Sequence, residues 1–251
     1  DVRILMLTRH EERRLLERLE NVQSLDDLER VQQRMLDQLG IGLVTGVSTG
    51  GLQSLLLTVA LDPGQPSDRR AAAISQLTTS YSPANEKQLV KRNSELLAVF
   101  TGSVAGTTPL RRHVFEVLCD QPGQCSLVQD LRRGRVETFI GFVEGRSGRF
   151  KYLSVKRVLD RESDDQAAAS CIAAAAMASA AMPVFHQQMR VTGGPEGTRT
   201  LFDGGVRQSV FLYGIGAKLE DAMKAYASTS GATSLPRADQ YPAIYVVRNG
   251  P

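Results

Sequence analysis

The N-terminal part of the chain shows a strand pattern followed by a helix pattern. Residues 2–7 form a short apolar run of strand length, and residues 11–39 carry Leu, Val and Met side chains at helical spacing. We therefore expect a strand followed by one or two amphipathic helices. No domain boundary is visible in residues 1–251, which predicts one domain with residues 1–39 as an N-terminal helical extension.

A second apolar run leads into the first candidate chemistry. Residues 43–45 predict a buried strand that is broken at Gly46, and residues 52–61 predict a buried helix that stops at Pro63. Ser48 lies between the two, at the junction of the strand and the helix.

The middle of the chain predicts covering helices and a hairpin. Residues 71–100 have a helical pattern with a break near Ser82 and Pro83, and residues 107–118 predict a further helix introduced by Thr-Thr-Pro. Residues 136–143 and 152–158 are strand-like runs. The Gly-Arg-Ser-Gly sequence at 145–148 is a turn signal, so we expect these two runs to form a hairpin.

The last third of the chain adds a helix and a strand. An Ala-rich helix follows a cap at Ser163 or Asp164, and it ends before Pro183. Residues 192–200 are rich in glycine and predict a mobile loop, whereas residues 240–249 predict a closing strand. Strands that alternate with helices favour a layered α/β fold.

Composition and charge narrow the class of protein. The chain is 42% hydrophobic and 23% charged, which is typical of a globular domain, and its net charge is only +3. Nucleic acid is disfavoured as a partner because Trp is absent and no aromatic residues interleave with the basic ones. The arginine pairs indicate charged faces exposed to solvent. The alternative is that Arg132, Arg133 and Arg135 form a patch that binds anionic lipid headgroups.

The cysteines indicate in which cellular compartment the protein could function. Cys119 and Cys125 flank a Pro-Gly turn signal and could form a small disulfide loop or remain two unrelated thiols. A bridge would favour a periplasmic, outer-membrane-associated or secreted protein, and free thiols would favour the cytoplasm. Cys171 lies in the Ala-rich stretch and predicts a small core residue.

Residues 46–50 read Gly-Val-Ser-Thr-Gly, a Gly-x-Ser-x-Gly motif. Its glycines, Gly46 and Gly50, allow a backbone turn so sharp that the side chain of Ser48 stands exposed. The start of a helix at Thr49 would place a positive dipole beside a developing anion. The alternative is a glycine-rich turn with a capping serine, but the position between a strand and a helix favours a nucleophile.

A serine nucleophile needs a base, and histidine is the usual one. The chain has three histidines, His10, His113 and His186. In an α/β-hydrolase, only His186 comes late enough in the chain, and its acid would be Asp130 or Asp160. That choice leaves Asp203 unexplained. Asp203 is the better partner for Ser48, because Gly204 and Gly205 allow close backbone approach at the end of a strand.

Residues 46–51 and 201–205 together resemble the patatin family, whose catalytic dyad pairs a Gly-x-Ser-x-Gly serine with an Asp-Gly-Gly aspartate. Residues 178–183 are similar to a small-residue helix of that family, and residues 245–250 to the closing strand of some bacterial members. The resemblance runs from about residue 43 to the C-terminus.

The resemblance implies a three-layer α/β/α sandwich with a mostly parallel central sheet. It also implies that Asp203 removes the proton from Ser48, that an acyl-enzyme forms, and that water then releases a fatty acid. Such a carboxylic ester hydrolase, of lipase or phospholipase A type, would degrade lipids or other acyl esters and could contact a membrane surface. No cofactor or metal would be required, and the oligomeric state is not indicated.

One feature of the family is missing from this sequence. Patatin-like enzymes carry a Gly-Gly-Gly-x-Arg-Gly type of loop after their first strand, and here no glycine precedes Gly40. The chain could be an inactive binding module, or the oxyanion hole could be built from the Thr49 backbone and another segment. We favour a third explanation, that a glycine-rich segment is missing from this sequence, because the stretch before Gly40 leaves no room for it.

Overall fold

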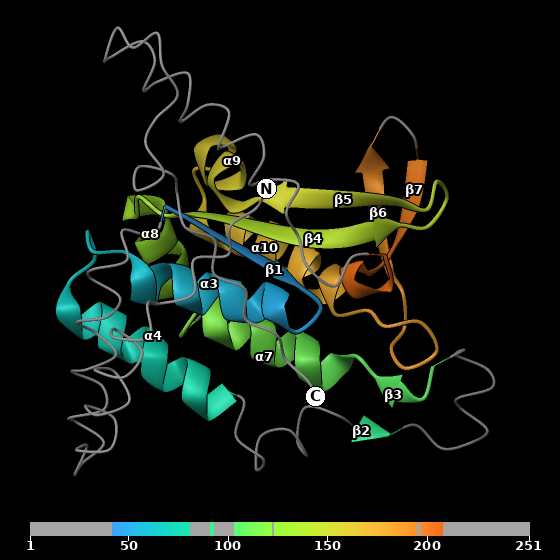
Figure 1. Cartoon of the computed structure of the whole chain (residues 1–251), viewed down its shortest axis with the longest axis horizontal. Helices are drawn as coiled ribbons and strands as arrows, with labels where there is room; N and C mark the ends of the chain where they lie inside the picture. The colour runs from blue at the N-terminus through green and yellow to red at the C-terminus, as the bar shows by residue number, and fades with distance from the viewer. Residues whose placement is uncertain (1–41, 81–90, 93–102, 122, 195–196, 208–251) are drawn as a thin grey trace, which may run out of the picture. The chain divides into compact units, whose positions relative to one another are not determined.

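The structure is a computed structural model that describes residues 42–80, 91–92, 103–121, 123–194 and 197–207 (Figure 1). All of them lie within a unit that runs from Gly40 to Phe211. The strands expected at 2–7 and 240–249, the helices expected at 11–39 and the residue His10 lie outside the described residues. The expectation of a single domain with an N-terminal helical extension therefore stays a prediction.

The centre of this unit is a five-stranded sheet. Its strands are β1 (Leu43–Val47), β4 (Glu137–Glu144), β5 (Arg149–Ser154), β6 (Met189–Gly194) and β7 (Gly197–Asp203). The strand order is β1-β4-β7-β6, and β5 pairs with β4. Strand β4 is therefore central, since it pairs with β1, β5 and β7.

The directions of these strands correct the expected sheet. Strands β1 and β4 run parallel, but the pairings of β4 with β5, β4 with β7 and β6 with β7 are antiparallel. The prediction of a mostly parallel sheet is therefore wrong for the described strands. The cause is that β4–β5 and β6–β7 are joined by short connections, which permit only antiparallel neighbours.

The hairpin expected from residues 145–148 is confirmed, with different strand ends. The Glu144 carboxylate accepts the backbone N–H groups of Arg146 (2.9 Å) and Ser147 (3.0 Å), which stabilises the turn. The second strand ends at Ser154, because its hydroxyl accepts the Arg157 N–H and begins helix α9 (Val155–Arg161).

Two other predicted segments are also strands. Residues 192–200 do not form a loop throughout, because β6 and β7 pair along most of this stretch. Residues 91–92 do not continue a helix, because they form β2 (Lys91–Arg92), which pairs with β3 (Ala105–Gly106). In both places pairing with another strand outweighs the local pattern.

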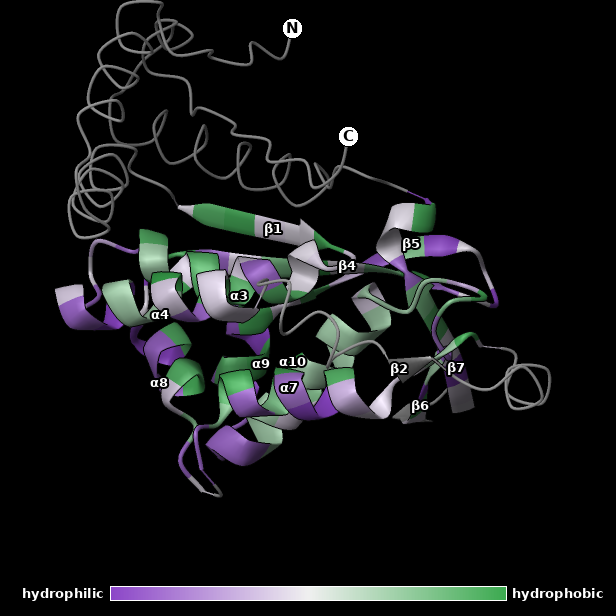
Figure 2. Cartoon of the chain, turned by 90° about the horizontal axis from the view of Figure 1, so that it is seen from below, coloured by the Kyte–Doolittle hydropathy of each residue, from purple (hydrophilic) through white to green (hydrophobic). Residues whose placement is uncertain are grey.

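Helices pack on the sheet as a layer (Figure 2). Helix α3 (Gly50–Leu61) packs against β1 and β4, and α10 (Asp165–Ser179) packs against β4 and β7. The two helices contact each other, and α7 (Thr108–Leu118) packs on α10, so all three share one face of the sheet. The described residues thus form a mixed α/β structure, and the second helical layer of the expected sandwich stays a prediction.

Buried hydroxyls are paired where α3 and α10 meet the sheet. Ser54 Oγ donates to the Gly51 carbonyl at 2.8 Å, and Ser179 Oγ donates to the Gly141 carbonyl at 2.6 Å. Because each hydroxyl has an acceptor, burying it costs little. The small side chains of α10, among them Ala168, Ala169 and Ala176, let this helix approach the sheet closely.

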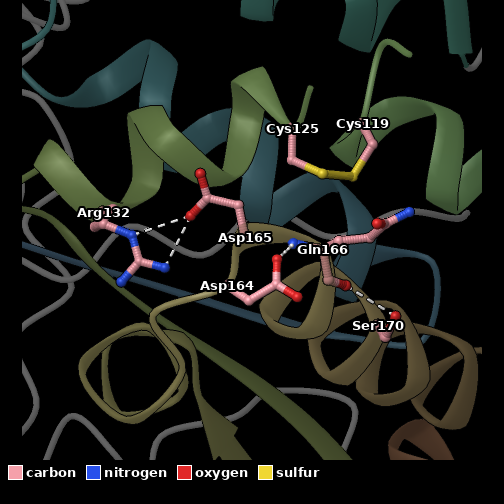
Figure 3. Close-up of a disulfide and its surroundings, with 7 residues drawn as sticks. All are labelled: Cys119, Cys125, Arg132, Asp164, Asp165, Gln166 and Ser170. Atoms are coloured by element: carbon pink, nitrogen blue, oxygen red, sulfur yellow. Dashed lines mark hydrogen bonds and ion pairs between the residues drawn. A yellow bond between two sulfur atoms is a disulfide. The ribbon is translucent and has the colours of Figure 1, made fainter. Parts of the chain in front are cut away.

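A disulfide joins Cys119 at the end of α7 to Cys125 at the start of α8 (Ser126–Arg133), as Figure 3 shows. The bridge confirms one of the two alternatives for these cysteines. By chain entropy, a loop this short adds about 2 kcal/mol of stability. Location in an oxidising compartment stays a prediction that this bond favours. Cys171 is exposed rather than buried, because it lies on the outer face of α10.

Arg132 stabilises the packing of α8 instead of facing a ligand (Figure 3). Its guanidinium lies 2.9 Å from the Asp165 carboxylate and donates to the carbonyls of Leu159 and Glu162. Because these three partners hold its guanidinium, Arg132 is not available to bind an anionic headgroup. The alternative of a headgroup patch formed by Arg132, Arg133 and Arg135 is therefore not supported at Arg132. Among the described residues, no helix has both the length and the apolarity needed to cross a bilayer.

Candidate active site

Ser48 occupies the sharp turn between β1 and α3. Its φ is 58°, in the left-handed region, which costs a non-glycine residue about 1 kcal/mol or more. The Ser48 carbonyl accepts the Gly51 N–H at 3.0 Å, and the Thr49 carbonyl accepts the Leu52 N–H at 3.2 Å. These bonds hold the strand-to-helix turn, in which the side chain of a nucleophile is presented outward.

The two motif glycines differ in how closely other atoms approach them. A Cβ atom on Gly46 would lie 2.0 Å from the Gly50 carbonyl oxygen, so only glycine lets the helix fold back against the strand end. A Cβ atom on Gly50 would meet no atom of the described residues within 4 Å. The turn is therefore tightly packed at Gly46 and open at Gly50.

Asp203 is the last residue of β7 and lies beside Ser48. Ser48 Oγ donates to Asp203 Oδ2 at 2.6 Å, and the Gly205 N–H donates to Asp203 Oδ1 at 2.7 Å. Only 2% of Asp203 is exposed, and its N–H donates to the Ala181 carbonyl at 3.0 Å. Both carboxylate oxygens thus have donors, and one of these donors is the serine hydroxyl.

The glycines after Asp203 let this turn pack against β1 and β4 and beside Ser48. A Cβ atom on Gly204 would lie 2.7 Å from the Gly141 carbonyl oxygen and 2.8 Å from Val47 Cγ1. A Cβ atom on Gly205 would lie 3.0 Å from Asp203 Oδ1 and 4.0 Å from the Cβ atom of Ser48. Close backbone approach, and not an unusual φ, is the reason that glycine suits both positions.

A strand-turn-helix serine within hydrogen-bond distance of an Asp-Gly-Gly carboxylate is the arrangement that the resemblance implied. The model of the patatin-like phospholipase family matches residues 38–213, which include both side chains. The chain belongs to the patatin-like phospholipase family. A comparison with curated proteins found no match. Family membership confirms the resemblance and implies acyl hydrolase activity on a lipid substrate.

The two described histidines, His113 and His186, differ in their surroundings. His113 Nε2 lies 3.2 Å from Ser80 Oγ, on helices remote in sequence from both motifs. Burial lowers the pKa of His186, and the negative charge of Asp203 opposes that shift. The buried Nδ1 atom of His186 has no hydrogen-bond partner among the described residues.

The acids that His186 would need as partners lie elsewhere. Asp130 is buried in an ion pair with Arg69 at 2.6 Å, and its backbone carbonyl accepts the Gln65 amide. Asp160 is exposed on α9. Neither arrangement supports a Ser-His-acid triad around Ser48.

The start of α3 is the described element best placed to bind a developing oxyanion. The first N–H groups of a helix have no carbonyl four residues earlier to accept them, and they form the positive end of its dipole. Thr49 directly precedes α3, and no described atom lies within 4 Å of a Cβ position on Gly50, so a substrate atom could approach there. The described residues hold no cluster of three metal-ligating side chains.

The sequence did not reveal one structural contact of this patatin-like site, the Ala181 carbonyl that holds the Asp203 N–H. Its signal was present as the small-residue segment 178–183 that ends before a proline. The pattern alone did not indicate that this segment bonds the backbone of Asp203.

Proposed function

We propose that the protein is a serine acyl hydrolase of lipase or phospholipase A type, with Ser48 as nucleophile and Asp203 as general base. The observation that carries the proposal is the 2.6 Å hydrogen bond from Ser48 Oγ to Asp203 Oδ2. A carboxylate at this distance is placed to accept the hydroxyl proton as the oxygen attacks.

The reaction would proceed in two halves. Asp203 takes the proton of Ser48 as Oγ attacks the ester carbonyl, and the tetrahedral intermediate collapses to an acyl-enzyme while the leaving alkoxide takes that proton. Water then gives a proton to Asp203 and attacks the acyl-enzyme. Collapse of the second intermediate releases the fatty acid and returns the proton to Ser48 Oγ.

The surroundings of Asp203 suit this role. The Gly205 N–H holds Oδ1, so the carboxylate is fixed with Oδ2 directed at the serine. The start of α3 lies next to the attacked carbonyl, where the positive end of the helix and the Thr49 backbone would stabilise the negative oxygen. Removing a donor of this kind typically costs about a hundredfold or more in rate.

The test combines a soluble ester with an active-site probe. We expect Ser48→Ala and Asp203→Asn each to lower kcat/KM for a short nitrophenyl ester by about a thousandfold or more. A fluorophosphonate should label the parent protein and fail to label Ser48→Ala. Melting temperatures of both variants establish that the loss is chemical and not structural.

Matched controls separate the alternatives. Ser170→Ala removes an exposed hydroxyl on α10, and Asp160→Asn removes an exposed carboxylate on α9, so both should leave turnover unchanged. A loss in His186→Gln as large as that in Asp203→Asn would favour the triad alternative. Failure of the parent protein to label would favour an inactive binding module.

A further inference from the structure

Four large apolar side chains are exposed in two segments that lie side by side next to the candidate active site. We call this group the apolar lip, and its members are Val104, Met182, Val184 and Phe185. The exposed fraction is 73% for Val184 and 50% for Met182. Single exposed apolar residues are ordinary, but a group of them marks a surface that contacts something apolar.

The lip is built on hydrogen-bonded backbone. The Val104 N–H donates to the Val184 carbonyl at 2.9 Å, and the Ala105 N–H donates to the Phe185 carbonyl at 2.9 Å. These bonds hold the segment at β3 beside the turn that follows α10 (Figure 1). The side chains are therefore presented to solvent by a fixed scaffold.

The backbone at Val184 is strained. Its φ is 70°, in the left-handed region, where a β-branched residue is an outlier. Asparagine or glycine would suit this position better, yet the chain places a valine there with most of its surface in water. Strain of this kind persists where the surrounding structure imposes it, and it gathers at functional sites.

The lip adjoins the proposed dyad. The Ala181 carbonyl accepts the Asp203 N–H, and Ala181 directly precedes Met182. The ring of Phe185 meets the ring of His186 edge to face at 5.3 Å between centroids, and the charge of Asp203 acts on His186. The same short segment therefore bonds the backbone of Asp203 and carries three of the four lip residues.

The segments that form the lip carry no formal charge. Residues 103–110 and 179–189 contain no Asp, Glu, Lys or Arg, whereas the chain is 23% charged. His186 lies among them, and burial favours its neutral form by lowering its pKa. The two segments themselves have no charge to desolvate, which suits an apolar medium rather than an acidic or basic partner. Lys91 and Arg92 of β2 pair with Gly106 and Ala105 and lie at the border of these segments.

We propose that the apolar lip inserts among the acyl chains of an aggregated lipid surface and thereby brings the Ser48 site to its substrate. The inference rests on the acyl hydrolase function proposed above. Lipid is the occupant because the chain belongs to a phospholipase family and the lip adjoins Asp203. Burial of apolar side chains at the boundary of a bilayer supplies the affinity.

The test measures binding without turnover. Full-length protein with Ser48→Ala is sedimented with phosphatidylcholine vesicles, and two variants are added in that background. Val184→Asn removes the apolar side chain and suits the positive φ, and Met182→Gln keeps the length of the side chain while making it polar. Each should weaken the partition to vesicles by about fivefold or more.

The matched control is Val191→Asn, which makes the same substitution at an exposed valine of β6. It should change the partition by less than about twofold, because Val191 is outside the lip. Binding should also persist when salt is raised, since salt does not screen the burial of apolar side chains. A steep loss with salt, or equal losses in Val184→Asn and Val191→Asn, would overturn the proposal.

Further outcomes separate this inference from the function on which it rests. If the Ser48→Ala protein does not bind the vesicles, the lip has no lipid role even when the parent hydrolyses soluble esters. If the variants change vesicle binding as expected but the parent hydrolyses no ester, the lipid-binding role of the lip is supported and the hydrolase proposal fails. A change in oligomeric state in Val184→Asn, measured without lipid, would instead identify the lip as a contact between copies of the chain.

Discussion

The turn at Ser48 and the turn at Val184 are the two described places where a non-glycine residue has a positive φ. They differ in what surrounds them. At Ser48 the strain holds a side chain against a buried carboxylate, and glycines on both sides of the pair let backbone approach within contact distance. At Val184 the strain holds a side chain out in water, with only its backbone bonded.

Strained backbone therefore positions two different kinds of side chain in this molecule. Around Ser48 it fixes the serine hydroxyl against the Asp203 carboxylate, which requires dense packing and a defined hydrogen bond. Around Val184 it fixes an exposed surface, which requires a stable scaffold and a side chain without local partners. The two turns are joined through Ala181 and Asp203, so one short segment supports both.

Replacing each strained residue with glycine should produce the largest contrast. Ser48→Gly removes the nucleophile, so kcat/KM for a soluble ester should fall by about a thousandfold or more. Its stability should stay within about 1 kcal/mol of the parent, because relief of strain offsets the lost hydrogen bond. Val184→Gly loses no hydrogen bond, so it should be more stable by about 1 kcal/mol.

Urea denaturation gives the stabilities, and hydrolysis of a short nitrophenyl ester gives the rates. If Val184→Gly proved less stable than the parent, the backbone at that turn would not be strained in solution. Equal rate losses in the two variants would show that the Val184 turn belongs to the reacting site itself.

A second contrast lies within the motif. Gly46→Ala places a Cβ atom 2.0 Å from the Gly50 carbonyl oxygen, which requires a backbone shift and should cost about 3 kcal/mol of stability. Gly50→Ala meets open space and adds a better helix former, so it should gain up to about 1 kcal/mol. Thermal and urea unfolding of the two variants measure the difference, and similar stabilities would contradict the tight packing at Gly46.

The local part of this site could be predicted from sequence because it depends on residue types that favour particular backbone turns. Gly46 and Gly50 around Ser48 predict a sharp turn, and the flanking apolar runs predict the strand and the helix. Asp203 with two glycines predicts a close backbone approach. Each of these signals depends on residues within a few positions of one another.

The rest depends on contacts between distant segments. The sheet direction follows from which strands are joined by short connections, and residues 192–200 read as a loop because pairing with a neighbouring strand leaves no local signal. Val104 and Val184 are far apart in sequence, so no periodic pattern indicates that their side chains share a surface. The backbone hydrogen bonds that hold β3 beside the turn after α10 bring these two exposed side chains to one surface.

The smallest expected effect is on the pH dependence of stability. It concerns the Val184 turn, because His186 follows that turn in the sequence. Burial lowers the pKa of His186 in the folded state, so the unfolded state binds the proton more readily. The resulting stability is fully present above the ordinary histidine pKa, about 6.5, and is lost as pH falls below it. We expect His186→Gln to show a shallower loss of stability between pH 7 and pH 5 than the parent.

His113 provides the matched comparison for this measurement. Burial also lowers its pKa, but it lies beside Ser80 instead of the dyad. His113→Gln should therefore flatten the same pH dependence, and the effects of the two substitutions should add because the sites share no partner. The hydrolysis rate should tell them apart, since only His186 lies within the electrostatic influence of Asp203. An unchanged pH dependence of unfolding in His186→Gln would mean that this ring is not desolvated beside the carboxylate.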